Sequence, residues 1–315
     1  MTAPIMTRPE APSKGASSPA SAPAPGAALP RKRRTNPYSW LTESLGKGVA
    51  HVFLIAWAVI ALFPILWGVF SSLKANDEIF ASPWAMPEVL QWDNYVRAWN
   101  EADIGRYFWN TIVVVGGSLL LTMALGAMVA YVLARFQFRL NRPIFYLFMV
   151  GMMFPIFLAI VPLFFVVNDL GLLGTHLGLI LVLSAYGLPF TVFFLVGFFA
   201  TLPESVAEAA LLDGCGHAET FFRIMLPMAK PGLVSVGIFN FLNLWNNYLI
   251  PLVLNPDPEK YVLSQGLASL AITQGYAADY GALFAGLVIA MLPVLAAYLA
   301  FHRQLQGGIS LGALK

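Results

Sequence analysis

Residues 201–232, TLPESVAEAALLDGCGHAETFFRIMLPMAKPG, form a polar segment in an otherwise apolar chain. Its charged and titratable residues are Glu204, Glu208, Asp213, His217, Glu219, Arg223 and Lys230. Long apolar runs flank the segment on both sides. Because charged side chains are costly inside hydrocarbon, we expect the segment on the water side, between two membrane spans. A polar surface in this position favours contact with another protein.

The composition of the whole chain is that of an integral membrane protein. The chain has 315 residues, of which 58% are hydrophobic and 11% are charged, whereas a soluble domain carries about 25% charged residues. The net charge of +2 gives no electrostatic basis for binding nucleic acid. The single cysteine, Cys215, excludes an intramolecular disulfide and a cysteine metal cluster. No phosphate-binding GxxxxGK[ST] loop is present, so the sequence predicts no cofactor and no metal.

The N-terminal part differs in composition from the rest. Pro, Ala and Ser make up 19 of the first 30 residues, a composition that cannot bury a core. The basic run at 31–34 is typical of an anchor to anionic lipid and of an orientation signal. The first apolar run begins near residue 51, too late for a cleaved signal peptide. We therefore expect a disordered basic tail at 1–45 and a transmembrane domain at 46–315.

Apolar runs predict six transmembrane helices, since about 20 residues cross the hydrocarbon. They lie at 51–73, 109–134, 143–167, 177–200, 231–254 and 281–301. Pro64, Pro155, Pro162, Pro189 and Pro293 fall inside these runs and predict kinked helices. Small residues in the second run predict close packing between helices. They are Gly116, Gly117, Ser118, Thr122 and Gly126.

The distribution of Lys and Arg predicts the orientation. With the N-terminus inside, 14 of the 18 basic residues lie on the inner side and 4 on the outer side. Both termini and the polar segment are then cytoplasmic, in the cell (plasma) membrane. The outer loop at 74–107 is rich in aromatic residues, which suit a membrane interface or a docking surface and could also stack on a sugar.

The polar segment predicts two short helices. Thr201–Glu204 has the form of a capping box, so a helix should begin there and end near Leu212. The glycines in Asp213–Gly216 should break it, because glycine readily adopts the left-handed conformation at a helix end. A second helix is expected at 217–225. Helices of this length are marginal alone in water, so they must pack against something.

The spacing within this segment resembles a known motif. Glu208-Ala209-Ala210, three residues, Gly214, nine residues, then Ile224-x-Leu226-Pro227 agree with the EAA motif of the membrane subunits of type I ABC importers. The resemblance implies that the loop at 201–230 couples the protein to an ATPase. The implied coupling residues are Glu208, Ala209, Ala210, Asp213, Gly214, Ile224, Leu226 and Pro227.

The resemblance extends over about residues 45–315. Glu78-Ile79-Phe80, Asn94-Tyr95 and Trp245-Asn246-Asn247 are similar to the carbohydrate-uptake branch, in particular to the G-type subunit of maltose-type importers. The implied fold is the all-α permease fold with six transmembrane helices and a cytoplasmic coupling loop. The implied role is that of a non-catalytic subunit that translocates a sugar, while a separate subunit hydrolyses ATP.

The resemblance also implies the partners. They are a second permease subunit in a heterodimer, two copies of a cytoplasmic ABC ATPase, an extracellular solute-binding protein, the sugar substrate and membrane lipid, with no nucleic acid. ATP binding would move the coupling loop and switch the bundle between inward-facing and outward-facing states. Malto-oligosaccharides, amino-sugar oligomers and glycerol phosphodiester-type solutes are the candidate substrates.

The fifth apolar run carries the candidate substrate pathway. Asn240, Asn243 and Asn247 are spaced i, i+3 and i+7, so they should share one face of a helix, and Asn246 and Tyr248 add polar groups. Amides both donate to and accept from hydroxyl groups, which suits a sugar pathway. Hydrogen bonding between helices explains the same residues equally well.

Two other classes of protein agree less well with the sequence. A self-contained secondary transporter or channel should have charged residues inside its spans for ion coupling, and the six predicted spans contain no Asp, Glu, Lys or Arg. A membrane enzyme should show a catalytic cluster, and the lone His176 is more typical of a helix cap or an interface.

Overall fold

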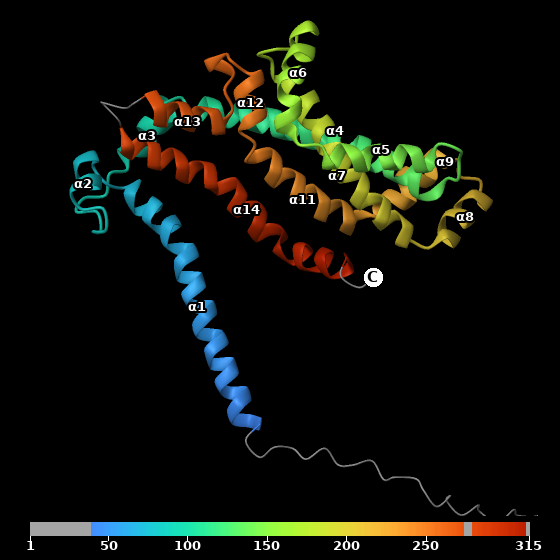
Figure 1. Cartoon of the computed structure of the whole chain (residues 1–315), viewed down its shortest axis with the longest axis horizontal. Coiled ribbons are helices and arrows are strands. Elements are labelled where there is room, and N and C mark those ends of the chain that lie inside the picture. Colours follow the sequence, from blue (N-terminus) through green and yellow to red (C-terminus); the bar gives the residue numbers. More distant parts are fainter. Residues whose placement is uncertain (1–38, 274–278, 313–315) are drawn as a thin grey trace, which may run out of the picture. The chain divides into compact units, whose positions relative to one another are not determined.

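The computed structural model describes residues 39–273 and 279–312, and every regular element in these ranges is a helix. The predicted tail at 1–45 lies outside the described residues as far as residue 38, and helix α1 (Ser39–Ser71) begins before the predicted boundary. The chain divides within α1 into two units, Met1–Val59 and Ile60–Lys315. All later helices belong to the second unit. Figure 1 shows the described helices coloured along the sequence, from blue to red.

The apolar helices account for the predicted spans. Four described helices are long and apolar enough to cross a membrane: α1, α4 (Ile104–Arg135), α7 (His176–Thr201) and α14 (Tyr280–Gly312). Two bent helix pairs bring the number to as many as six. The prediction of an all-α fold is confirmed. Pro64, Pro189 and Pro293 lie inside continuous helices, as the tolerance of membrane helices for proline allows.

The third predicted span, 143–167, is divided at Pro155, one of the prolines that predicted kinked helices. Helix α5 (Asn141–Met153) ends and α6 (Ile156–Asp169) begins at Pro155, with a bend of 103° between them. Proline forces the preceding residue out of the helical region, and Phe154 is extended, with φ −77° and ψ 121°. The break therefore has a local cause in the sequence.

The fifth predicted span, 231–254, is also interrupted. Helix α11 (Lys230–Trp245) ends at Trp245, and the short α12 (Leu249–Leu254) begins after three intervening residues. A continuous helix would bring the ring of Pro251 against the carbonyl of Asn247, four residues before it. The 3-10 helix Pro258–Lys260 and α13 (Leu263–Thr273) follow α12.

Helices α4 and α7 pack closely through small residues. A Cβ atom at Gly126 would lie 2.5 Å from Thr191, and one at Gly117 would lie 2.8 Å from Ile180, so both glycines permit the approach. Gly116 has no neighbour within 4 Å at that position, so it contributes nothing to the contact. Ser118 and Thr122 are buried in the interface. Small residues of this kind let the backbones of membrane helices approach closely.

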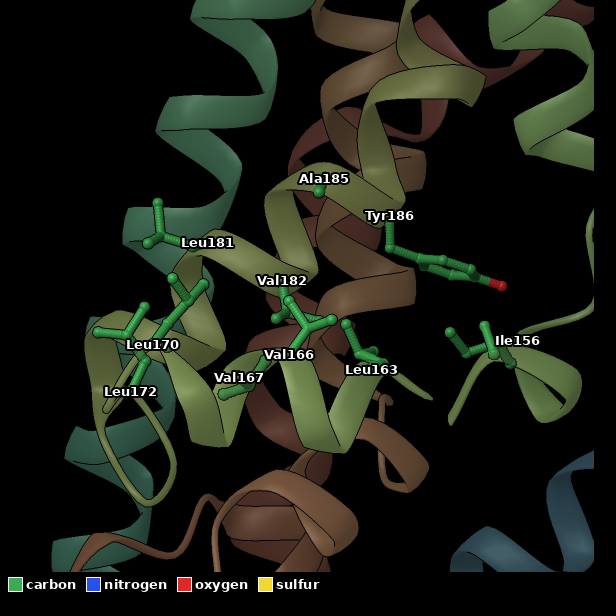
Figure 2. A pocket seen from close by; sticks show the side chains of 12 residues that line it. Ile156, Leu163, Val166, Val167, Leu170, Leu172, Leu181, Val182, Ala185 and Tyr186 are labelled. Carbon is green, nitrogen blue, oxygen red and sulfur yellow. The ribbon is translucent and has the colours of Figure 1, made fainter. Parts of the chain in front are cut away.

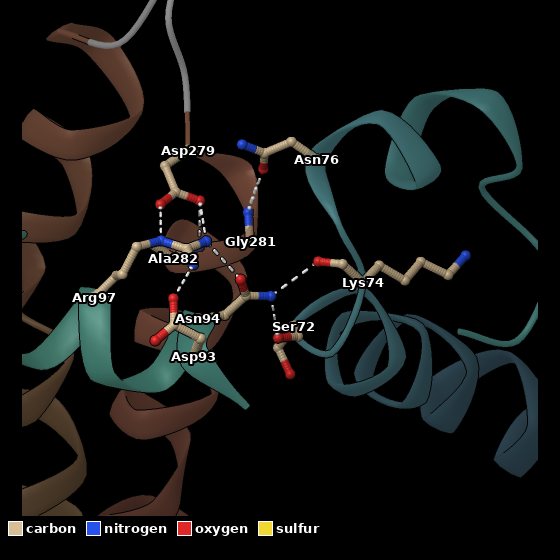
Figure 3. Close-up of polar contacts among 9 residues, drawn as sticks. All are labelled: Ser72, Lys74, Asn76, Asp93, Asn94, Arg97, Asp279, Gly281 and Ala282. Atoms are coloured by element: carbon tan, nitrogen blue, oxygen red, sulfur yellow. Dashed lines mark hydrogen bonds and ion pairs between the residues drawn. The ribbon is translucent and has the colours of Figure 1, made fainter. Parts of the chain in front are cut away.

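A network of polar groups connects segments far apart in the sequence (Figure 3). We call it the polar clasp; it consists of Asn76, Asp93, Asn94, Arg97, Asp279 and Gly281. Helix α3 (Asp93–Asn100) contributes Arg97, whose guanidinium binds the Asp279 carboxylate through Nε at 2.7 Å and Nη2 at 3.2 Å. The amide of Asn94 donates to the carbonyls of Ser72 and Lys74 at 2.8 and 2.9 Å. The clasp thus joins the end of α1, α3 and the start of α14.

The clasp also includes a hydrogen bond between Asn76 and Gly281, and it fixes the charge states of Arg97 and Asp279. Asn76, the first residue of α2 (Asn76–Ala81), accepts from the backbone N–H of Gly281 at 2.9 Å. Hydrogen bonding to Asp279 raises the pKa of the Arg97 guanidinium, and the same bond lowers the pKa of the Asp279 carboxyl. Both groups are therefore held in their charged forms.

Candidate functional site: the loop between α7 and α11

Helix α8 (Glu204–Leu212) carries the EAA residues, and it begins without the predicted capping box. Thr201 is still the last residue of α7, and its hydroxyl donates to the carbonyl of Phe198 at 2.7 Å. The N-cap position is Pro203, which is extended and makes no side-chain capping bond. The prediction was wrong because α7 continues as far as Thr201 and uses its hydroxyl internally.

The C-terminal end of α8 has the predicted glycine break. Gly214 has φ +90°, the left-handed conformation that only glycine adopts without strain. The N–H of Cys215 donates to the carbonyl of Ala210 at 3.0 Å, and the N–H of Gly214 donates to that of Leu211 at 3.1 Å. This pair of bonds is the Schellman motif, which satisfies the last carbonyls of a helix. Helix α8 therefore has a sharply defined end.

The polar face of α8 is exposed. Glu208 and Ala209 are exposed, whereas Ala210 is 5% exposed and packs against the protein. Within the described part of the chain, no hydrogen bond or ion pair engages the side chains of Glu204, Glu208 or Asp213. The side chain of Leu212 is 88% exposed at the tip of the helix.

The second half of the loop is anchored in the bundle. Helix α9 (His217–Thr220) leads into a π-helical turn at Phe221–Met225 and then into α10 (Leu226–Met228). The region predicted as a second helix is thus helical, with a widened turn just before Pro227, which has no N–H to donate. Phe221 and Met225 are buried in a core cluster with Leu195 and Phe199.

The two halves of the EAA pattern consequently differ in environment. Ile224 and Leu226 are half-buried against the same core cluster, and Pro227 is exposed. Glu208 and Gly214 lie on the exposed half. The loop presents a short helix outward and fixes its other half to α4 and α7.

The candidate pathway residues of α11 fall into different environments. Asn240 is 5% exposed, and its amide donates to the hydroxyl of Thr191 on α7 at 2.7 Å. This is the helix-to-helix hydrogen bond that the sequence left open as an alternative. Asn243 lies one turn further along α11 and is exposed.

The predicted face shared by three asparagines is wrong for Asn247, because α11 ends at Trp245. Asn246 caps α11, is exposed, and donates to the carbonyl of Leu242 at 2.8 Å. Asn247 accepts from the N–H of Ile250 at 3.3 Å through its amide oxygen. Tyr248 is 37% exposed. These residues form the break between α11 and α12.

Two cavities lie among the apolar helices, and only the second includes a residue of the break between α11 and α12. One of about 330 Å³ lies between α6 and α7 and is lined by aliphatic side chains and Tyr186, most of which are labelled in Figure 2. Its lining gives a hydroxyl-rich solute few hydrogen-bonding partners. The other, of about 420 Å³, includes Asn246 and Ser264 among otherwise apolar residues. The second cavity is therefore the better match to a polar solute.

Neither the described helices nor their connections bring together three or more His, Cys, Asp or Glu side chains that could hold a metal ion. One residue next to the loop was missed. Arg135 is one of the 14 basic residues that the orientation count places on the inner side, yet its guanidinium also donates to the carbonyl of Leu202 at 2.6 Å. No pattern along the chain connects positions so far apart.

Comparison with known proteins identifies the class. Residues 122–310 match the family described as "Binding-protein-dependent transport system inner membrane component". The chain belongs to this family, whose members are the non-catalytic permease components of ABC importers, with ATP hydrolysis on a separate subunit. It is therefore a multi-pass membrane protein of an ABC import system.

Particular relatives and a solved structure are similar over most of the chain. The diacetylchitobiose uptake system permease protein NgcG of Streptomyces coelicolor is 51% identical over 85% of this chain and 88% of its own length. The melibiose/raffinose/stachyose import permease protein MelC of Bacillus subtilis is 33% identical over 78% of this chain and 88% of its own. A bacterial ABC transporter for the polysaccharide alginate matches with a TM-score of 0.76 at 21% identity, over 83% of this chain and 97% of that one, and supports the fold.

Proposed function

We propose that this permease imports an oligosaccharide and that α8 is the element through which an ATPase drives it. The observation that carries the proposal is the geometry of α8. The helix is exposed, its acidic groups have no partner among the described residues, and a Schellman motif fixes its end. A rigid helix with exposed carboxylates that are not paired within the described chain fits the cleft of another protein.

The partners follow from this role. A second permease subunit would complete the translocation path, two copies of an ABC ATPase would bind the coupling loops, and a solute-binding protein would deliver the sugar. The loop, both termini and the ATPases would be cytoplasmic, which agrees with the excess of Lys and Arg on that side. The membrane would be the cell membrane.

The proposed substrate class is an oligosaccharide of amino sugars. The support is the 51% identity to a diacetylchitobiose permease, compared with 30–33% for relatives named for other sugars. Among the predicted pathway residues, Asn243, Asn246 and Tyr248 keep exposed polar groups, whereas Asn240 is engaged by Thr191. The exposed three are the candidates for sugar contacts in this subunit.

The decisive test of the coupling role is Glu208→Lys in the complete transporter. Reversing this charge should weaken association of the ATPase and reduce uptake about tenfold or more. A loss of about 1.4 kcal/mol in the free energy of association is enough for a tenfold effect. The matched control is Glu101→Lys, an equally exposed glutamate on a different part of the chain. Normal co-purification of the ATPase and normal uptake with Glu208→Lys would refute the role.

The import mechanism has its own test. This chain alone in liposomes should transport no sugar, and uptake should require ATP, the ATPase and the solute-binding protein together. Robust uptake by the chain alone would show a self-contained transporter instead.

The substrate is tested most directly on the solute-binding protein encoded beside this chain. Calorimetry should show tight binding of an N-acetylglucosamine disaccharide and weak binding of maltose. Preference for maltose would refute the proposed amino-sugar substrate but would leave the proposed coupling role of α8 unaffected.

A further inference from the structure

The connection between α4 and α5, residues 135–141, touches the coupling loop at two places. At its first residue, Nη2 of Arg135 donates to the carbonyl oxygen of Leu202 at 2.6 Å. Leu202 is the C-cap residue of α7, extended with φ −72° and ψ 145°, and α8 begins two residues later. The arginine therefore binds the backbone at the point where the chain turns from α7 into α8.

The second contact lies beyond the other end of α8. The ring of Phe136 packs edge-on against the imidazole of His217, with ring centroids 5.4 Å apart and an interplanar angle of 75°. His217 is the first residue of α9. Phe136 also contacts Tyr131 of α4, at 5.9 Å between centroids. Helix α8 is thus flanked, before and after, by neighbouring residues of one short connection.

This connection is itself held firmly. The amide of Asn141, the first residue of α5, donates to the carbonyl of Leu133 at 2.9 Å and to that of Phe136 at 2.7 Å. These bonds satisfy carbonyls at the C-terminal end of α4, where a helix has no partners of its own. A displacement of the connection must therefore be shared by α4 and α5.

The environment of Arg135 shows that the residue serves the loop's backbone. None of the described carboxylates lies within 4 Å of its guanidinium. Its Nε is buried and has no hydrogen-bond partner in this conformation. Buried donors are normally satisfied, so an open one marks a group with capacity for a second acceptor. A guanidinium with a planar fork of donors can hold one carbonyl while it gains another.

We propose that Arg135 is a positioning residue that transmits the displacement of α8 to α4 and α5, with Phe136 as the second contact. The proposal rests on the coupling function of α8 and adds the route by which its movement enters the bundle. It assigns to the α4–α5 connection a mechanical role, since Arg135 touches neither the ATPase-facing residues nor the candidate sugar contacts.

The first experiment compares Arg135→Met with Arg139→Met in the complete transporter. Arg139 is exposed and belongs to the same connection, so its variant matches the change in charge. Arg135→Met should retain the ATPase on purification but lower the sugar transported per ATP hydrolysed by about fivefold or more, the size of a typical coupling between sites. Arg135→Lys should restore part of the ratio, because its ammonium still donates to a carbonyl. Arg139→Met should match the wild type.

A second experiment measures position directly. In a Cys215→Ser background, spin labels at Leu212→Cys and Arg139→Cys report the distance between the tip of α8 and the connection. Arg135→Met should broaden this distance distribution, and Arg135→Lys should narrow it again. An unchanged distribution together with an unchanged transport ratio would overturn the proposal, as would loss of ATPase binding, which would make Arg135 part of the docking surface.

The outcomes separate this inference from the function on which it rests. If Glu208→Lys leaves ATPase association and uptake normal, the coupling function itself falls. If Glu208→Lys acts as expected but Arg135→Met transports as much sugar per ATP as the wild type, only the route through Arg135 falls.

Discussion

The polar clasp and helix α8 are both polar parts of an apolar chain, but they differ in whether their charged side chains are paired within it. In the clasp, Arg97 and Asp279 have side chains 30% and 26% exposed and are joined by two hydrogen bonds. On α8, Glu208 is exposed and has no partner among the residues described. The charged groups of the clasp are paired within the chain, whereas the carboxylates of α8 are exposed and accessible to another molecule.

This difference separates two meanings of a charged residue in a membrane protein. A charge paired within the chain stabilises the fold, and its loss should appear as a change in unfolding free energy. A charge that is solvated and unpaired contributes little to stability, and its loss should appear in association and transport. Variants at the two places should therefore change different measured quantities.

The largest effect on stability is expected for Arg97→Ala. The substitution removes the bonds to Asp93, Asn94 and Asp279 and takes the guanidinium away from the Asp279 carboxylate, which should cost about 3 kcal/mol. Reversible unfolding in mixed micelles measures it. Arg106→Ala, which breaks a more exposed pair with Asp103, is the control and should cost about 1 kcal/mol at most.

The clasp should also weaken in acid. The hydrogen bond from Arg97 lowers the pKa of Asp279 in the folded protein. The Asp279 carboxylate therefore stabilises the fold at pH values above its pKa in the unfolded chain. This stabilisation is lost as the pH falls through the lowered pKa of the folded state. Unfolding followed from neutral pH to about pH 3 should show this loss, since an ordinary Asp titrates near 3.9. Asp279→Asn should flatten that part of the profile; an identical slope in the variant would contradict the assignment.

Gly281→Ala should come next in size, at about 2 kcal/mol. A Cβ at this position would lie 2.7 Å from the Asn94 amide, which cannot move without losing its bonds to Ser72 and Lys74. Gly197→Ala in α7 is the matched control, because nothing lies within 4 Å of its Cβ position. Equal unfolding free energies for the two variants would show that the clasp tolerates expansion.

Gly214→Ala should cost about 1 kcal/mol for a different reason. The space around its Cβ position is open, but φ is +90°, where a side chain strains the backbone. The strain should loosen the end of α8 and reduce uptake more than it lowers the unfolding midpoint. Gly216→Ala is the control, since Gly216 has an ordinary φ of −73°; the same loss of uptake in both variants would argue against the role of the left-handed turn.

The smallest effect on stability is expected for Glu208→Gln, within about 0.5 kcal/mol. The side chain is exposed and unpaired in the described chain, so the fold loses nothing when the charge is removed. ATPase association should nevertheless weaken, and a pull-down measures it. A marked drop in the unfolding midpoint would place Glu208 among the structural residues.

Much of the fold follows from local sequence. Apolar runs of sufficient length, the left-handed turn at Gly214 and the break at Pro155 each arise from one residue type or one short run. The EAA spacing likewise indicated the family, which the comparison confirms, because each of its residues lies within one short segment. The capping box failed since the hydroxyl of Thr201 had a nearer acceptor in α7.

The tertiary structure decided which polar side chains have a hydrogen-bond or ion-pair partner within the chain. Only packing shows that Asn240 is bound to Thr191 while Asn243 is exposed, although both lie on one helix. Only packing brings Arg135 to Leu202 and Arg97 to Asp279, pairs separated by 67 and 182 positions. The sequence determined the class of protein, its apolar helices and its EAA motif, because those depend on composition and short spacing. The structure determined the partners of each charge, because side chains distant along the chain meet only when the helices pack.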